Sequence, residues 1–254
     1  MLFDSHAHYN DTRFDDDCFQ ILDCMKENGV GYIVNAADSM ASIDKILPLC
    51  EKYDFIYASV GVHPEEAGSL CETDIERLKE FSNHNKVCAI GEIGLDYHYD
   101  DIPKQVQKYW FDRQLALAEE VNLPVIIHDR EAHTDCLEIL KRHDIQRIGA
   151  VMHCYSASAE MAEDFLALGM YFGFGGTVTF KNAKKVQKAA EKIPIERILL
   201  ETDCPYLAPE PHRGERNSSL FMHYVSEKIA EIKGISVQEV ESITTENARK
   251  LYRI

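Results

Sequence analysis

The sequence contains eight short apolar runs, which begin about 22–37 residues apart along the chain. Each run is rich in Val, Ile, Tyr or Phe, and most remain apolar until their last few residues. This pattern is typical of strands that are buried on both faces of a parallel sheet. The predicted strands are Leu2–Tyr9, Gly31–Asp38, Ile56–Pro64, Val87–Tyr97, Pro124–Arg130, Gly149–Ser156, Tyr171–Val178 and Ile198–Pro205.

The segments between these runs predict helices, so the chain is organised as consecutive strand–helix units. Gln105–Val121 has helical spacing, with its apolar face formed by Val106, Trp110, Leu117 and Val121. Two further segments match the capping-box pattern that marks a helix N-terminus, Thr73–Glu76 and Ser236–Glu239. The second of them predicts an additional C-terminal helix after the eighth unit.

The length of the chain decides how these units are arranged. At 254 residues the chain matches an eight-stranded α/β barrel, which typically has about 250 residues. No linker rich in Pro, Gly or Ser divides it, so we expect residues 1–254 to form a single domain. We therefore predict a (β/α)8 TIM barrel with an additional C-terminal helix, and a doubly wound open sheet is the alternative.

Charge and cysteine content restrict the class of protein. The chain carries 27 Lys and Arg against 43 Asp and Glu, for a net charge of −16, which argues against a broad basic surface for nucleic acid. The eight cysteines form no CxxC pair, and the start of the chain does not resemble a signal peptide. No apolar run reaches the ~18 residues of a membrane span. We expect a cytoplasmic protein with reduced thiols, no membrane association and no obligate protein partner.

Polar side chains gather where the predicted strands end, which in a barrel is the face that carries the active site. His6 and His8 are two residues apart, so on a strand both imidazoles point the same way. Glu92 interrupts the apolar fourth run, where a charge is costly unless it is paired or bound to metal. Three other strands end in a residue of metal-ligand type, which are His128, His153 and Asp203.

These six residues exceed the needs of one tetrahedral zinc ion. They suit two metals about 3.5–4 Å apart that share a carboxylate, an arrangement that stabilises attacking and leaving oxygens and lowers the pKa of bound water. Glu92 is the natural bridge, and Asp203 could accept the proton of the water. The donor types leave Zn, Mn, Mg and Ni open as the divalent metal. The predicted half-sites are His6, His8 and Asp203 for one metal, and His128 and His153 for the other.

Several segments together resemble the TatD family of metal-dependent hydrolases, within the amidohydrolase-like barrel superfamily. The matching segments are Phe3–His8, Gly61–Pro64, Gly91–Tyr97, Pro124–His128, His153–Ser156 and Leu200–Leu207. The resemblance implies a (β/α)8 barrel with a binuclear divalent-metal site and deoxyribonuclease activity. It also implies metal ligands at His6, His8, Glu92, His128, His153 and Asp203, the set reached above.

The resemblance extends to candidate substrate contacts. His63 matches an active-site histidine of the family that faces the substrate phosphate. Arg130 follows His128 by two residues and is a phosphate-clamp candidate, with a surface salt bridge to Asp129 or Glu131 as its alternative. The family loop after the eighth strand commonly reads Arg-Asn-Glu-Pro, and here it reads Arg216-Asn217-Ser218-Ser219. Arg213 and Asn217 are retained from the family pattern. Ser218-Ser219 thus replaces Glu-Pro, so the loop departs from the family pattern at these two positions.

Three functions are compatible with these observations. The first is an exonuclease-type deoxyribonuclease, with Asp203, Glu92 and His63 as catalytic residues. The negative net charge of the chain favours contact with a few nucleotides, in single-stranded DNA or at strand ends, over binding of duplex DNA along a long groove. The second is a binuclear-metal hydrolase of a small ester, amide or aminoacyl substrate. The third is a non-catalytic barrel that acts as a binding protein.

Overall fold

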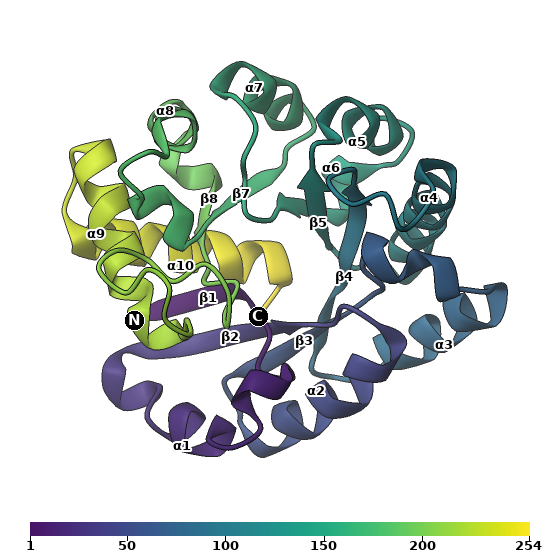
Figure 1. Ribbon diagram of the computed structural model, residues 1–254, viewed down its shortest axis with the longest axis horizontal. Helices are drawn as coiled ribbons and strands as arrows, with labels where there is room; N and C mark the ends of the chain where they lie inside the picture. Colours follow the sequence, from purple (N-terminus) through teal and green to yellow (C-terminus); the bar gives the residue numbers. More distant parts are fainter.

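The computed structural model describes residues 1–254 and contains one sheet of eight parallel strands in sequential order. The strands form a ring around a central axis (Figure 1). The ring closes between the first and last strands, where Ala7 pairs with Cys204 and the His8 N–H donates to the Cys204 carbonyl at 2.8 Å. This confirms the TIM barrel and excludes the open sheet. The strands are β1 (Leu2–Ala7), β2 (Val30–Ala36), β3 (Ile56–Val60), β4 (Val87–Asp96), β5 (Val125–Arg130), β6 (Ala150–Met152), β7 (Tyr171–Phe174) and β8 (Ile198–Leu200).

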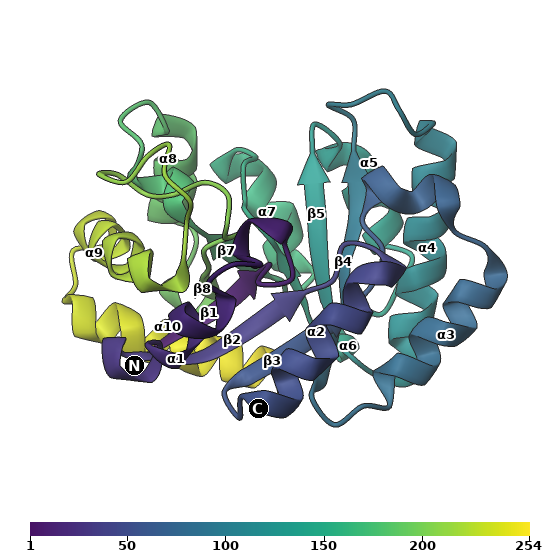
Figure 2. The ribbon, with the colours of Figure 1, turned by 60° about the horizontal axis from the view of Figure 1, so that its bottom comes forward.

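Helices surround this ring and cover the outer face of the strands (Figures 1 and 2). The α-helices are α1 (Cys18–Asp23), α2 (Met40–Lys52), α3 (Glu72–Ser82), α4 (Lys104–Val121), α5 (His133–Leu140), α6 (Ile145–Ile148), α7 (Ala159–Ala167), α8 (Lys184–Lys192), α9 (Met222–Lys233) and α10 (Val237–Tyr252). Short 3-10 helices occupy Thr12–Phe14, Lys26–Asn28, Pro64–Ser69, Gly176–Thr179, Ile195–Arg197 and Ser219–Phe221.

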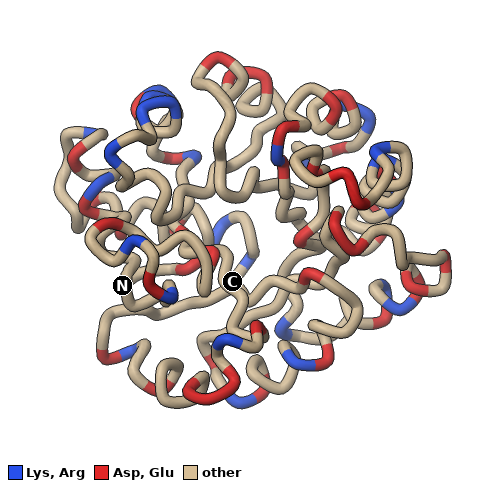
Figure 3. The backbone as a smooth tube through the Cα atoms, in the orientation of Figure 1, with Lys and Arg blue, Asp and Glu red and all other residues tan.

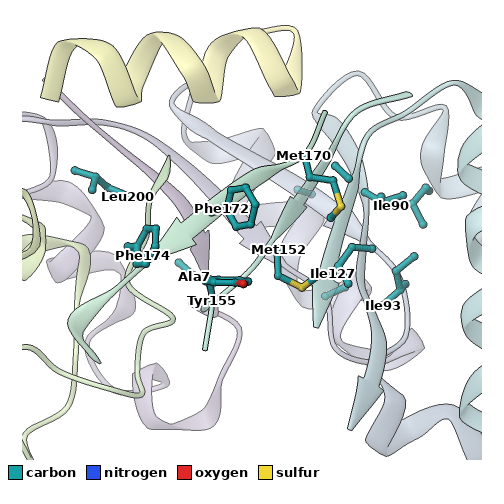
Figure 4. Packing of buried hydrophobic residues seen from close by; sticks show 14 of the residues in the cluster. Ala7, Ile90, Ile93, Ile127, Met152, Tyr155, Met170, Phe172, Phe174 and Leu200 are labelled. Carbon is teal, nitrogen blue, oxygen red and sulfur yellow. The ribbon is translucent and has the colours of Figure 1, made fainter. Parts of the chain in front are cut away.

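The apolar residues form two separate clusters, as expected for strands buried on both faces. The larger contains 63 buried residues, among them Ile127, Met152 and Phe172 (Figure 4). The smaller contains 11 residues and combines side chains from seven strands with three from α10, which are Ala248, Leu251 and Tyr252. The Tyr252 hydroxyl also donates to the Ser5 carbonyl at 3.1 Å. The C-terminal helix therefore packs against the barrel strands from the end opposite the β-strand arrowheads (Figure 2).

The sequence predicted one of the two capping boxes correctly. Ser236 caps α10, because its hydroxyl accepts from the Glu239 N–H while the Glu239 carboxylate accepts from the Ser236 N–H. The box at Thr73 is wrong, since α3 begins two residues earlier with Cys71 as its N-cap. The physical reason is Asp74, whose carboxylate accepts from the Cys71 N–H at 3.0 Å and so satisfies a free donor at the helix start.

The predicted long helix is also present, as α4. Trp110 and Leu117 are buried as expected, whereas Val106 and Val121 are only partly buried against the core. None of the helices combines the length and apolarity that a bilayer crossing requires. Acidic and basic residues are interspersed over the outer helices (Figure 3).

We expect Leu251→Ala to destabilise the barrel by about 2–5 kcal/mol, because it leaves a cavity between α10 and the strands. Urea unfolding of the full chain measures this change. Lys250→Ala is the matched control, since Lys250 is exposed on the same helix and its replacement should change stability by less than about 0.5 kcal/mol. Equal unfolding midpoints for the two variants would contradict the packing role of α10.

Candidate metal centre

The alternation of side chains along the strands explains how ligands reach one point. Successive strand residues face opposite sides, so residues two apart share a face. On three strands an apolar member of the smaller core cluster is followed two residues later by a polar side chain of the site. These pairs are Ile126 and His128, Val151 and His153, and Leu199 and Glu201. Apolar side chains therefore fill the depth of the barrel, and ionisable ones gather at its C-terminal end.

Glu92 of β4 lies at the centre of this group and is buried. Its Oε2 is 3.3 Å from His6 Nε2 and 3.7 Å from His8 Nε2. Its Oε1 lies within 3.8 Å of a nitrogen of three further imidazoles, which belong to His63, His128 and His153. The two carboxylate oxygens thus face two different sets of imidazoles, which is the geometry expected of a bridging ligand.

Asp203 completes one side of the centre. Its Oδ1 is 3.4 Å from His8 Nε2 and 3.7 Å from His6 Nε2, and it forms one compact group with these two residues. This is the first predicted half-site. On the other side, the compact group joins Glu92 and His128 with His63, whereas His153 is grouped with His6 and Glu92. The compact groups on this side therefore do not coincide with the predicted pair of His128 and His153, whose role as ligands of the second metal stays a prediction.

The donor set fits a cation. His6 Nε2 and His8 Nε2 are only 2.9 Å apart, and two imidazole nitrogens at this separation repel unless a proton or a cation lies between or beside them. Both residues are buried, so solvent screens that repulsion only weakly. A mixture of imidazole and carboxylate donors suits divalent transition metals. The ligand roles themselves stay a prediction of the sequence that the geometry accommodates.

Burial and ion pairing push the pKa values of the histidines apart. Burial, with His128 close by, lowers the pKa of His63 to about 3. Burial also opposes a charge on His128, but Asp96 and Glu92 outweigh it and raise its pKa to about 9. For His153, Glu201 and Glu92 outweigh burial and raise the pKa to about 10. Without metal, the site therefore holds protons on two of the predicted ligands at neutral pH.

Further polar groups orient these rings from behind. His8 Nδ1 lies 3.0 Å from the Ala36 carbonyl, which fixes the tautomer that leaves Nε2 free toward the site. His153 Nδ1 is 3.1 Å from Glu201, a buried carboxylate that also accepts from the Cys154 N–H at 2.7 Å. Glu201 occupies space that a side chain at position 173 would fill, which explains the glycine there.

The centre lines a cavity of about 400 Å³ that opens at the C-terminal end of the barrel. Its rim contains Arg130 and two half-exposed tyrosines, Tyr99 and Tyr206. A family model described as TatD related DNase matches residues 3–253.

The chain belongs to the TatD family of metal-dependent hydrolases.

Relatives match this TatD-family chain over its whole length. The metal-dependent hydrolase YabD of Bacillus subtilis is 48% identical over 254 residues, which is 100% of both chains. The metal-dependent hydrolase YcfH of Escherichia coli is 35% identical and covers 100% of this chain and 96% of its own. The crystal structure of the TatD homologue YjjV from E. coli has a TM-score of 0.94 at 33% identity, covering 100% of this chain and 98% of that one.

The predicted substrate contacts of this TatD chain lie in different places. His63 and Arg130 line the central cavity, whereas Arg213 lines a neighbouring cavity. Asn217 lines neither of these two cavities, and its role in substrate binding stays a prediction. Its buried amide donates to the Thr202 carbonyl at 2.8 Å and accepts from the Ser218 N–H at 2.8 Å. Asn217 therefore holds the loop after β8 to the barrel.

The two serines that depart from the family loop have a structural role as well. Ser219 donates through its hydroxyl to buried Asp4 at 2.6 Å, and its N–H donates to the Tyr9 hydroxyl at 3.0 Å. These bonds tie the loop to the first strand, so the loop remains anchored without the Glu-Pro pair.

Sequence reasoning missed two carboxylates in segments that it had singled out. Asp96 ends β4 and lies 2.9 Å from His128 Nε2, so it competes with any ligand of that nitrogen. Glu201 supports His153 from beneath. Strand alternation could have found both, because Asp96 is four residues from Glu92 and Glu201 is two residues from Asp203.

We expect metal binding to release protons and to strengthen as the pH rises to about 9. His128 and His153 have pKa values raised to about 9 and about 10, and they must lose their protons to coordinate. Titration calorimetry with Zn²⁺ or Mn²⁺, in buffers of different ionisation enthalpy, measures the proton release. His98→Gln, an exposed histidine paired with Glu131, should leave the release unchanged. A metal affinity independent of pH would contradict the ligand assignment.

Proposed function

We propose that this TatD-family hydrolase is a metal-dependent phosphodiesterase that removes nucleotides from ends of single-stranded DNA. The observation that carries this proposal is the position of Glu92, with each carboxylate oxygen facing a separate set of imidazoles. Two divalent ions held on either side of it would stabilise the attacking and leaving oxygens of a phosphodiester. The name of the matching family model, TatD related DNase, supports DNA as the substrate.

Asp203 is suited to accept a proton from the attacking water. Burial raises its pKa, but the hydrogen bond with His8 and the neighbouring His153 and His6 outweigh burial and hold the pKa below its usual value. The carboxylate is therefore ionised at neutral pH. It is also about one-sixth exposed, and it lines the cavity where a substrate would lie.

His63 is suited to donate a hydrogen bond to a phosphate oxygen. The Glu65 N–H donates to His63 Nδ1 at 3.2 Å, so the proton of the neutral ring resides on Nε2. That nitrogen lies 3.7 Å from Glu92 and borders the cavity. Because the pKa of His63 is lowered to about 3, this donor persists across the physiological pH range.

Arg130 supplies a free cation at the rim of the cavity. Neither Asp129 nor Glu131 pairs with it, because Asp129 contacts His133 and Glu131 contacts His98. The Arg130 guanidinium carbon lies 5.2 Å from the centre of the Tyr99 ring. Its donors therefore remain available for a phosphate, a group that arginine binds in bidentate fashion.

The second candidate function is hydrolysis of a small ester, amide or aminoacyl substrate. The acidic residues that line the same cavity favour it, namely Asp38, Glu65 and Asp96. Together with the net charge of −16, these carboxylates would repel a polyanion that approached the cavity on the side where they lie.

We expect Asp203→Asn to lower kcat on single-stranded DNA by about 10²–10⁴-fold, because the general base is removed. Nucleotide release with added Mn²⁺ or Mg²⁺, and with chelator as the zero point, measures the effect. Asp54→Asn is the control, since Asp54 is exposed and paired with Lys26 at the start of β3. If the wild type released nucleotides no faster than Asp203→Asn, the nuclease assignment would be overturned. Turnover of a small ester by the same wild-type preparation would then favour the second candidate function.

A further inference from the structure

A second cavity of about 450 Å³ adjoins the metal centre. It is formed by segments that follow β1, β7 and β8, and Figure 2 shows the last two together at the C-terminal end of the barrel. Tyr206 lines both cavities, and its ring is 6.3 Å from that of His8. A substrate bound at the metal centre can therefore continue directly across Tyr206 into the second cavity.

Arg213 provides an uncommitted cation in this second cavity. Its one ionic contact is Glu210 at 4.0 Å, and its guanidinium lies 4.3 Å above the Phe180 ring. Arg13, on the opposite side, is already paired with Asp11 through two hydrogen bonds of 3.0 Å and stacks on Tyr206. Arg213 is therefore the group that can bind an anion without breaking a strong pair.

The surroundings of the metal centre are electrostatically asymmetric. Another neighbouring cavity shares Glu65 and Asp96 with the central one and adds the carboxylates of Glu66 and Asp101. The second cavity, in contrast, is lined by Arg13 and Arg213 and by one carboxylate, that of Glu215, and Asp11 already neutralises Arg13. A polyanion that is bound at the metal centre is thus repelled on the acidic side and attracted toward Arg213.

Aromatic and apolar surface accompanies this cation. Tyr206 and Leu207 are 45% and 40% exposed. Phe180 adds a half-buried ring beneath Arg213. Aromatic faces beside a cation are the means by which proteins bind single-stranded nucleic acid without reading its sequence.

We propose that the second cavity binds the nucleotide next to the scissile phosphodiester of single-stranded DNA. Arg213 contacts its phosphate, and Tyr206 with Phe180 contacts its base and sugar. The inference rests on the proposed nuclease function, which it deepens by specifying a substrate that extends beyond one phosphodiester. A small ester would fill only the central cavity.

The test is binding of a short fluorescein-labelled oligothymidylate to the full chain with chelator present, measured by fluorescence anisotropy over a range of salt concentrations. We expect Arg213→Gln to weaken binding about tenfold and to reduce the slope of log K against log salt by about 0.7, the value for one phosphate contact on a single strand. Phe180→Leu should weaken binding without changing the slope, because it removes stacking but no charge.

Arg249→Gln is the matched control. Arg249 pairs with Glu246 three residues away at 4.0 Å, as Arg213 does with Glu210, and it is similarly exposed on α10. It should leave affinity and slope unchanged. Equal effects of Arg213→Gln and Arg249→Gln, or no binding by the wild type, would overturn the inference. Failure of the nuclease proposal is distinguishable, since the wild type would then bind the oligonucleotide as described but release no nucleotide when metal is added.

Discussion

A buried carboxylate is the constraint on which the rest of the site depends. Glu92 lies inside the barrel, where an isolated charge is costly. Its pKa nevertheless lies well below the usual value, because His6 and the other surrounding imidazoles outweigh the effect of burial. These imidazoles come from strands far apart in sequence, so closure of the barrel between β1 and β8 is what assembles them. The charge of Glu92 and the ring of strands thus stabilise each other.

The residues that stabilise the barrel and the residues of the metal centre lie at different levels along the barrel axis. At one end, α10 packs Leu251 and Tyr252 against apolar strand residues and removes them from water. Two residues further along the same strands, ionisable side chains begin. A step of two residues along a strand therefore suffices to pass from the apolar core to the polar centre, and a shift of register by one residue would turn both sets of side chains to the other face of the strand.

Strand periodicity made most of the barrel and the six-residue centre predictable from sequence. Apolar runs define the strands, and their last residues define one face of the ring. The anchoring contact of Asn217 was not predictable, because a polar residue in a loop can face substrate or satisfy backbone groups, and spacing alone does not reveal the bond of its amide to the Thr202 carbonyl. The cap of α3 depended on whether Asp74 or Glu76 reached back to the chain, which spacing alone does not decide. The cavity around Arg213 is formed by loops that follow three different strands, so no local sequence pattern could have predicted it.

The positions of the charged residues in the structure decide how the net charge of −16 affects binding of DNA. Acidic and basic residues are interspersed over the outer helices in the view of Figure 3. Near the centre the distribution is uneven, with carboxylates of Glu65 and Asp96 on one side and the weakly paired guanidinium of Arg213 on the other. Long-range attraction to DNA is weak in such a protein, because exposed charges are screened within about 10 Å at moderate salt. Local asymmetry still acts within that distance. It therefore favours short, directional contact with a single strand over capture of a duplex along its length.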